Sequence, residues 1–228
     1  KPDAVIDIKK IPECHQFRMD QHHLIIGAAT RLNEFENNNS FPLLSSVTRE
    51  IADHTSNNSI TLGGNICGQI FYREAVLPFL LADSICITAR SSGLRKRNIN
   101  EMYNQHLLLE EGELLVSLAT KKEYVESNSI SIKIRQQWNT GYPLITVAAL
   151  NKDGYIRFAF SGLCPFPFRS EPMEGILNNH NLSMRERIGA ALPLIPGPIL
   201  NDVEGSSEYR LFVLENTLTT ILKKLGGE

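Results

Sequence analysis

Short apolar runs alternate with polar segments along the first half of the chain, and their spacing predicts strands and helices in turn. Residues 84–89 place an apolar side chain at every second position, as in a strand with one buried face. Residues 41–52 repeat apolar positions three or four apart, as in a helix that packs on a core. The expected elements are strands at residues 4–8, 22–28, 84–89 and 113–119, and helices at residues 31–36 (with Thr30 as N-cap), 41–52 and 74–83. Strands interleaved with helices favour a mixed α/β domain that ends near residue 122.

The second half has a different order, because its expected strands come first and its helices follow. Residues 121–129 are charged and polar, and they predict a linker between two domains. The expected elements after it are strands at residues 129–136, 144–150 and 155–160, and helices at residues 169–178, 183–194 and 211–225. Asp153 and Gly154 stand between two of these strands, where an Asp-Gly pair is a strong hairpin signal. We therefore expect domains at residues 1–122 and 127–228, the second of the α+β class.

The composition suits one large or two small globular domains and disfavours several classes of function. Of the 228 residues, 42% are hydrophobic and 21% are charged, which is enough for a core with a solvated surface. The net charge of −2 offers no basic surface to a nucleic acid, and the longest basic run, residues 95–97, is expected in a solvated loop. No apolar stretch approaches the roughly 18 residues of a membrane helix, and no signal peptide is recognisable.

Cysteine and histidine spacing gives no support to a metal site or to a hydrolase. The four cysteines form no Cys-x-x-Cys pair, so neither zinc nor an iron–sulfur cluster is expected in this chain. Isolated reduced thiols are typical of a cytoplasmic protein, which is the location we expect. The six histidines include one adjacent pair, residues 22–23, and form no Ser-His-Asp pattern.

The most informative stretch is residues 61–66, which read Thr-Leu-Gly-Gly-Asn-Ile. Glycine has no Cβ, so a ligand can approach its backbone closely. Successive backbone amides of this kind can form a concave, positively polarised surface that suits a phosphate group. Taken alone, an adjacent pair of glycines is more often an ordinary turn.

Three other segments, taken together with residues 61–66, resemble motifs of a known family. Residues 2–8, 25–30 and 205–210 follow the motifs Pro-x-x-hydrophobic-Ile-Asp-hydrophobic, Ile-Gly-Ala-x-Thr and Gly-Ser-Ala-x-Tyr-Arg in the expected order. Together with residues 61–66 they resemble the FAD-binding (medium) subunits of molybdenum hydroxylases, the xanthine dehydrogenase and carbon monoxide dehydrogenase flavoprotein family. The resemblance implies an α+β fold: an FAD-binding domain of the PCMH type, followed by a carboxy-terminal α+β domain of the CO dehydrogenase flavoprotein type. The family's first glycine loop is missing, so the chain is expected to begin inside the FAD-binding domain.

The resemblance implies an electron-transfer subunit of a xanthine dehydrogenase-like oxidoreductase. Electrons would pass from a molybdopterin-binding subunit, through a 2Fe-2S ferredoxin-like subunit, to FAD in this chain and then to NAD or another acceptor. A flavin suits this work because it accepts single electrons and can deliver a hydride. Two alternatives remain open: a degenerate scaffold subunit that no longer holds FAD, and a stand-alone flavin reductase.

The same resemblance selects residues for contact with FAD and none for catalysis. They are Thr61, Leu62, Gly63, Gly64, Asn65, Glu74, Ile51, Leu115 and Arg135. Several have a structural alternative: Leu62, Ile51 and Leu115 as core residues, and Glu74 as an acid at a helix N-terminus. Arg135 is alternatively a solvated strand residue, and Lys133 on the same strand face leaves the register open by two residues.

The chain also departs from the family pattern. Asn57 stands where family members often carry Arg, and Glu204 replaces another Arg. Residues 69–73 are bulkier than the small residues expected beside the cofactor, and residues 138–143 replace a cluster of charged residues. The rings of Phe71 and Tyr72 are expected either to stack on the flavin or simply to pack. These changes favour a divergent member of the family.

Overall fold

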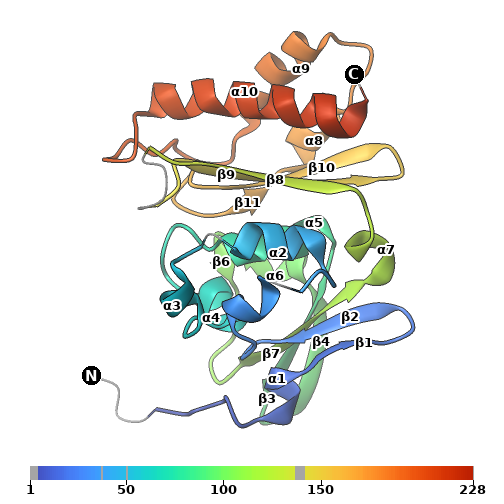
Figure 1. The fold of residues 1–228 in the computed structure, drawn as a ribbon, viewed down its shortest axis with the longest axis vertical. Coiled ribbons are helices and arrows are strands. Elements are labelled where there is room, and N and C mark those ends of the chain that lie inside the picture. The colour runs from blue at the N-terminus through green and yellow to red at the C-terminus, as the bar shows by residue number, and fades with distance from the viewer. Residues whose placement is uncertain (1–4, 37, 50, 137–141, 228) are drawn as a thin grey trace.

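A computed structural model describes residues 5–36, 38–49, 51–136 and 142–227, and it shows two antiparallel sheets with helical layers between and beyond them (Figure 1). The first sheet has the strand order β1-β2-β7-β3-β4. Its strands are β1 (Phe17–Met19), β2 (His23–Gly27), β7 (Leu114–Lys121), β3 (Ile85–Arg90) and β4 (Gly93–Asn98). A small hairpin, β5 (Tyr103–Asn104) and β6 (His106–Leu107), lies apart from this sheet.

The helices and 3-10 turns of the first half are α1 (Pro12–His15), η1 (Leu32–Phe35), α2 (Pro42–Thr48), α3 (His54–Asn57), α4 (Leu62–Cys67), η2 (Glu74–Val76), α5 (Leu77–Leu81), α6 (Ile99–Met102) and α7 (Lys122–Val125). Short helices of the first half, among them α2, α4, α5 and α6, form the layer between the two sheets, whereas α1 lies on the outer side of the first sheet (Figure 1). The α5 helix is apolar all round, as expected of a helix that is buried between the second sheet and the neighbouring elements α2, η2 and α6.

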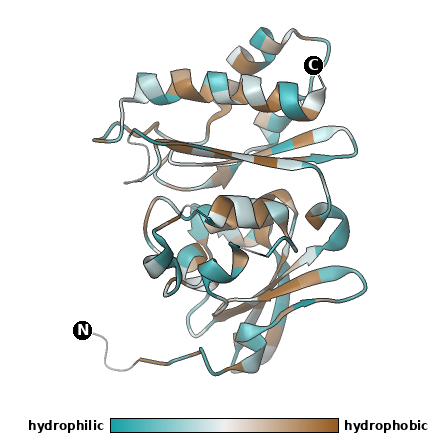
Figure 2. Cartoon of the chain, in the orientation of Figure 1, coloured by the Kyte–Doolittle hydropathy of each residue, from teal (hydrophilic) through white to brown (hydrophobic). Residues whose placement is uncertain are grey.

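The second half places its sheet between this helical layer and three further helices. The strand order is β11-β10-β9-β8, with β8 (Ser129–Ile134), β9 (Ile145–Lys152), β10 (Tyr155–Ser161) and β11 (Phe168–Arg169). The helical elements that follow are α8 (Glu171–Leu177), α9 (Met184–Ala191), η3 (Leu192–Leu194) and α10 (Ser207–Gly226). In Figure 2, apolar and polar residues alternate along α10, as expected of a helix with one face on a sheet.

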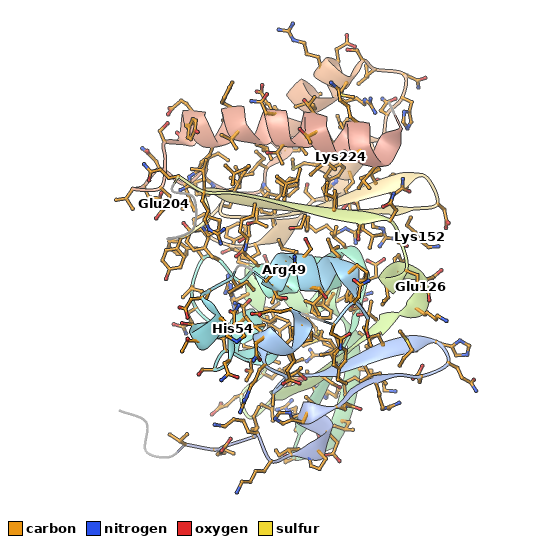
Figure 3. All side chains as sticks on the ribbon, viewed as in Figure 1. Arg49, His54, Glu126, Lys152, Glu204 and Lys224 are labelled. Carbon is orange, nitrogen blue, oxygen red and sulfur yellow. The ribbon has the colours of Figure 1, made fainter. Side chains whose placement is uncertain are left out.

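The continuous apolar run of β9 is explained by burial on both faces of the sheet. Val147 and Ala149 belong to the core under α10, whereas Ala148 and Leu150 belong to the core of the first half. Successive side chains of a strand point to opposite faces, so both sets must be apolar. Figure 3 shows side chains filling the space between the helical layer and the second sheet.

Several predicted elements are confirmed. Strands at residues 23–27, 85–90, 114–121, 129–134, 145–152 and 155–161 all form close to the expected positions. The hairpin between β9 and β10 turns at Asp153 and Gly154, whose φ angles of 52° and 88° are the positive values of a two-residue type I′ turn. The final helix begins four residues earlier than expected, because the Ser206 side chain accepts a hydrogen bond from Tyr209 N and caps it.

Other predictions were wrong. Residues 5–8 form no strand, and the remaining residue of that expected strand lies outside the described range. Thr30 caps no helix, since the segment after it is the 3-10 turn η1. Residues 95–97 lie in the edge strand β4 instead of a loop, because β4 pairs with β3 and the side chains of Arg95 and Arg97 bind Glu110 and Glu113. The expected linker contains the helix α7, and the domain boundaries on either side of it stay a prediction.

One ion-pair cluster ties the two halves together. Asp83, which follows α5, accepts hydrogen bonds from Arg157 on β10 and from Arg169 Nη1 on β11, the latter at 2.7 Å. Arg169 also binds the buried carboxylate of Glu174 at 2.8 Å. The φ angle of Asp83 is 48°, a left-handed conformation that Asp tolerates better than most residues. None of the described helices is long and apolar enough to cross a membrane.

Candidate functional site

The glycine motif begins the helix α4, and it is joined to the end of β2. Thr61 is the N-cap residue, and its Oγ1 accepts a hydrogen bond from Gly64 N at 3.1 Å. Leu62 N donates to Thr30 O and Gly63 N donates to Ala28 O, both at 2.8 Å. Two motifs that lie about thirty residues apart in sequence, 25–30 and 61–66, therefore meet in one structure.

The two glycines have different roles. Gly63 is buried, and a Cβ at this position would lie 2.8 Å from Ala28 Cβ and 3.0 Å from Ala28 O. Gly63 is thus required for close packing of α4 against the end of β2. Gly64 is exposed, and a Cβ there would meet only Thr61 Oγ1, at 2.9 Å. Gly64 is the position at which the backbone of α4 is open to a ligand.

The backbone amides of the motif already have acceptors within the chain. The amides of Leu62 and Gly63 bind the carbonyls of Thr30 and Ala28, which follow β2, while Gly64 N and Asn65 N bind the side chain and the carbonyl of Thr61. The Asn65 side chain is also used, because its Oδ1 accepts from Ala75 N at 3.1 Å and so joins α4 to η2. The Leu62 side chain lies in the core. Direct contact of these amides with a pyrophosphate therefore stays a prediction.

Glu74 connects the glycine motif to the second half of the chain. Its side chain is 1% exposed; it accepts from Lys133 Nζ on β8 at 3.1 Å and from the Thr146 hydroxyl on β9. Burial raises the pKa of Glu74, and the neighbouring Lys133 ammonium opposes that rise. Glu74 is the first residue of η2, as a helix N-terminal acid would be, but its carboxylate is held by the second sheet.

The other predicted residues lie around this cluster. Lys133 is the basic residue that reaches Glu74, and Arg135 follows two residues later, just after the end of β8. Leu115 is 2% exposed in the core on β7, a strand that contacts α4. Ile51 is partly buried against the same core. The structure thus brings residues 61–65 and 74 together directly and places the remaining three, Ile51, Leu115 and Arg135, on neighbouring segments.

In the loop after α4, the structure shows a stacked pair of tyrosine rings and a buried arginine that the sequence did not predict. Tyr72 stacks on Tyr142 from the second half, with ring centroids 4.7 Å apart and an interplanar angle of 12°. Phe71 remains 47% exposed. The sequence motifs did not select Arg73. This residue is buried and donates to Gly68 O at 2.9 Å and to Gln105 O. Nothing in its sequence context signals this burial, because it follows from the fold of the loop.

Comparison with known proteins identifies the class. Residues 1–119, half of the chain, match the family described as the FAD binding domain in molybdopterin dehydrogenase. The chain is therefore an FAD-binding protein of the α+β class. Its first sheet is joined to the helix α4, and a second sheet with its own helices follows. More narrowly, the chain belongs to the FAD-binding family of the molybdopterin dehydrogenases, as its sequence motifs predicted.

Individual relatives have low sequence identity to this chain, but their similarity extends over most of it. The nicotinate dehydrogenase FAD-subunit of Eubacterium barkeri is 21% identical over 218 residues, which cover 86% of this chain and 71% of that protein. Carbon monoxide dehydrogenase from Hydrogenophaga pseudoflava, in a form that lacks the Mo-pyranopterin moiety of the molybdenum cofactor, matches with a TM-score of 0.82 and 20% identity over 95% of this chain and 79% of that chain. Quinoline 2-oxidoreductase from Pseudomonas putida 86 matches with a TM-score of 0.81 and 19% identity, over 100% of this chain and 83% of that chain. Both structures share the fold.

FAD is the cofactor that this family's domain binds, and the start of α4 fits a phosphate group in two respects. The exposed backbone of Gly64 leaves open the space that a side chain would fill. The Thr61 hydroxyl accepts one hydrogen bond and retains its own proton to donate. Among the described residues, no group of three or more His, Cys, Asp or Glu side chains is placed to hold a metal ion.

Proposed function

We propose that this chain is the FAD-carrying electron-transfer subunit of a molybdenum hydroxylase. It would receive electrons from a 2Fe-2S subunit, which is reduced by a molybdopterin-binding subunit, and release them to NAD or another acceptor. The observation that carries this proposal is the family match over residues 1–119, with Gly64 open to a ligand at the start of α4. The name of the Eubacterium barkeri relative, an FAD-subunit of a dehydrogenase, supports it.

The residues of this chain would bind and position the cofactor. Bound FAD supplies one- and two-electron transfer. Thr61 would donate its hydroxyl proton to a phosphate oxygen, and Gly64 would let that phosphate approach the backbone. The Glu74–Lys133 pair would hold the second sheet against α4, so that both sides of the binding site keep their relative positions.

For the molecule oxidised by the whole complex, we propose a nitrogen heterocycle. The sequence led us to expect a xanthine dehydrogenase-like enzyme acting on a purine or a related heterocycle. The named relatives act on nicotinate, quinoline and carbon monoxide, and the first two are nitrogen heterocycles. The oxidised molecule would bind in the molybdopterin subunit, so the residues of this chain do not select between a purine and a pyridine.

The alternative of a scaffold without FAD has one observation in its favour. The four amides of residues 62–65 all have acceptors inside the chain, which leaves fewer free donors for a pyrophosphate than the motif suggested. A scaffold of this kind would keep the fold and the ties between the two halves while it lost the cofactor.

Flavin content separates these two functions. The complete protein should show a flavin absorbance spectrum and release FAD on denaturation. Gly64→Val should lose most of the FAD, because its side chain fills the open face of α4, while Gly189→Val, at an exposed helical glycine with open space around it, should keep the FAD. A colourless wild-type protein that takes up no added FAD would instead support the scaffold. Full FAD occupancy in a folded Gly64→Val protein would contradict the role of Gly64.

A further inference from the structure

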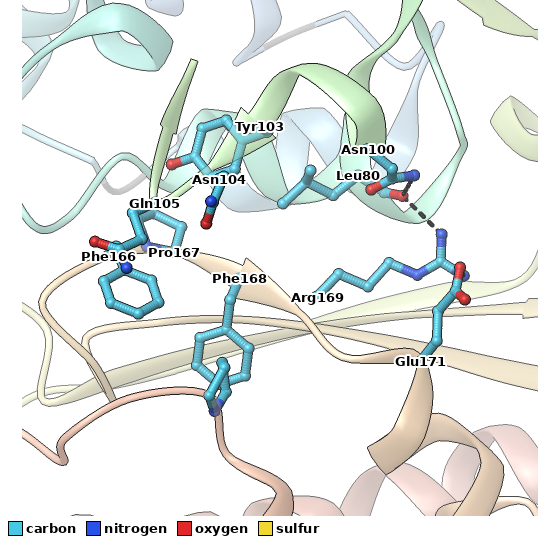
Figure 4. A pocket seen from close by; sticks show the side chains of 11 residues that line it. Leu80, Asn100, Tyr103, Asn104, Gln105, Phe166, Pro167, Phe168, Arg169 and Glu171 are labelled. Atoms are coloured by element: carbon cyan, nitrogen blue, oxygen red, sulfur yellow. Dashed lines mark hydrogen bonds and ion pairs between the residues drawn. The ribbon is translucent and has the colours of Figure 1, made fainter. Parts of the chain in front are cut away.

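A groove separate from the start of α4 lies between the β5–β6 hairpin and residues 165–169 of the second half. One part has a volume of about 370 Å³ and is drawn in Figure 4; the other part has about 600 Å³ and reaches the carboxyl end of α4. Gln105 and Phe166 line both parts, so the two are adjacent. Each part is in the size range of small-molecule sites.

Arg73 brings a buried positive charge to the larger part of the groove. It is 5% exposed, and it donates to two backbone carbonyls, Gly68 O and Gln105 O. Its Nε is buried without a hydrogen-bond partner, and no carboxylate among the described residues lies within 4.0 Å of the guanidinium. A buried cation without an acid is costly, and a bound anion would remove that cost.

A second unsatisfied group lies next to Arg73. The Tyr103 hydroxyl is buried and has no hydrogen-bond partner among the described residues, and the guanidinium carbon of Arg73 lies 6.0 Å from the centre of the Tyr103 ring. Burial raises the pKa of Tyr103, so the phenol keeps its proton and can donate it. Gln105, whose carbonyl accepts a hydrogen bond from Arg73, has a φ of 63°, a left-handed conformation that is uncommon for glutamine. Two unsatisfied donors and a strained backbone therefore meet where the two parts of the groove adjoin.

The smaller part of the groove suits a flat ring. Phe166 and Phe168 form an edge-to-face pair with ring centroids 6.4 Å apart, and Pro167 and Pro196 extend this apolar wall. Facing it in Figure 4 are the exposed amide side chains of Asn104 and Gln105. Amides both donate and accept hydrogen bonds, as the edge of a heterocyclic base requires.

We propose that this groove binds a nucleoside phosphate, either free or as half of a dinucleotide, with its phosphate at Arg73 and its base against Phe166. Arg matches the geometry of a phosphate group, and an aromatic ring offers a stacking surface to a base. The groove is distinct from the proposed FAD contact at Thr61 and Gly64. Arg73 binds Gly68 at the opposite end of α4, and a helix of this length spans about 9 Å.

Calorimetric titration of the FAD-loaded complete protein with AMP tests this proposal. AMP should bind, whereas adenosine and inorganic phosphate should each bind at least tenfold more weakly, because each lacks half of the contacts. Arg73→Gln and Phe166→Ala should each weaken AMP binding at least tenfold. Tyr103→Phe should weaken it two- to tenfold without loss of stability, since it removes a hydroxyl that has no partner. Arg95→Gln, at a half-exposed arginine on β4, is the matched control and should bind AMP normally.

FAD content is measured on every variant, because it distinguishes an effect on the groove from an effect on the proposed FAD site. The proposal requires AMP to bind while FAD stays bound, and FAD content to be unchanged in Tyr103→Phe and Phe166→Ala. Displacement of AMP by NAD would identify the dinucleotide as the source of the phosphate, and failure of NAD to compete would identify a mononucleotide. Absence of AMP binding, binding that is unaffected in Tyr103→Phe and Phe166→Ala, or AMP binding only to FAD-free protein would each overturn it. Loss of FAD from the wild type would count against the proposed function alone.

Discussion

Asp83→Asn tests how strongly the two halves of the chain depend on each other. The Asp83 carboxylate binds Arg157 and Arg169, whose side chains are 15% and 7% exposed. Arg169 keeps Glu174 as a second acid, but Asp83 is the carboxylate that Arg157 contacts among the described residues. Asparagine has the same shape and also tolerates a positive φ, so this change removes charge with little effect on the backbone.

The expected loss of stability follows from burial. Removing one partner of a fully buried ion pair costs about 3–5 kcal/mol, because the other charge is left uncompensated. The Asp83 side chain is 32% exposed, so solvent screens part of the interaction, and we expect a loss of about 2–3 kcal/mol. Asp153→Asn is the matched control: it also has a positive φ, but its side chain is 83% exposed, and its loss should stay below about 0.5 kcal/mol.

Urea denaturation of flavin-free protein at pH 7 measures both free energies of unfolding. A double-mutant cycle with Arg157→Met should give a coupling energy of about 1–2 kcal/mol, since the two residues contact each other. Strict additivity of the two changes, or an Asp83→Asn protein as stable as Asp153→Asn, would refute the idea that this ion pair holds the halves together.

Two further predictions concern the first sheet and the glycine helix. Glu113 is buried, which by itself raises its pKa, but hydrogen bonds from Thr88 Oγ1 (2.6 Å), Glu110 N (2.9 Å) and Arg97 lower the pKa to about 2. Because the folded pKa is below the unfolded value of about 4.3, Glu113 stabilises the fold above that pH by about 3 kcal/mol, and this contribution disappears as the pH falls from about 4.3 to about 2. Unfolding free energies at pH 7 and pH 3 should therefore show wild type and Glu113→Gln converging in acid, and a constant gap would contradict the low pKa. Gly63→Ala should destabilise the flavin-free protein by about 1–3 kcal/mol in the same urea assay, because its Cβ would lie 3.0 Å from the backbone oxygen of Ala28. Gly189→Ala, in open space on α9, should stabilise it by up to about 1 kcal/mol, and equal effects at both glycines would exclude a packing role for Gly63.

Local sequence was sufficient wherever an element is determined by its own residues. The hairpin at Asp153-Gly154 follows from the need for positive φ angles at both turn positions, and the strands β8, β9 and β10 follow from their apolar patterns, whereas β11 was not predicted. The same is true of the family resemblance, because the glycine motif and its neighbours keep a fixed spacing along the chain. Weakly patterned elements were missed: β4 carries exposed charged residues, and its register depends on β3 beside it.

The sequence by itself therefore determined the fold class, the family and the position of the glycine motif, but not that this motif begins the helix α4. Tertiary structure decided what each side chain at that helix does: Gly63 packs, Gly64 is open, Asn65 binds the backbone of Ala75, and Glu74 binds Lys133. It also decided that Arg73 is buried beside Tyr103, with no carboxylate of the described residues within 4.0 Å of its guanidinium. The physical reason is that burial and hydrogen-bond partners depend on segments far away along the chain. Turns, caps and apolar periodicity depend on residues only a few positions apart.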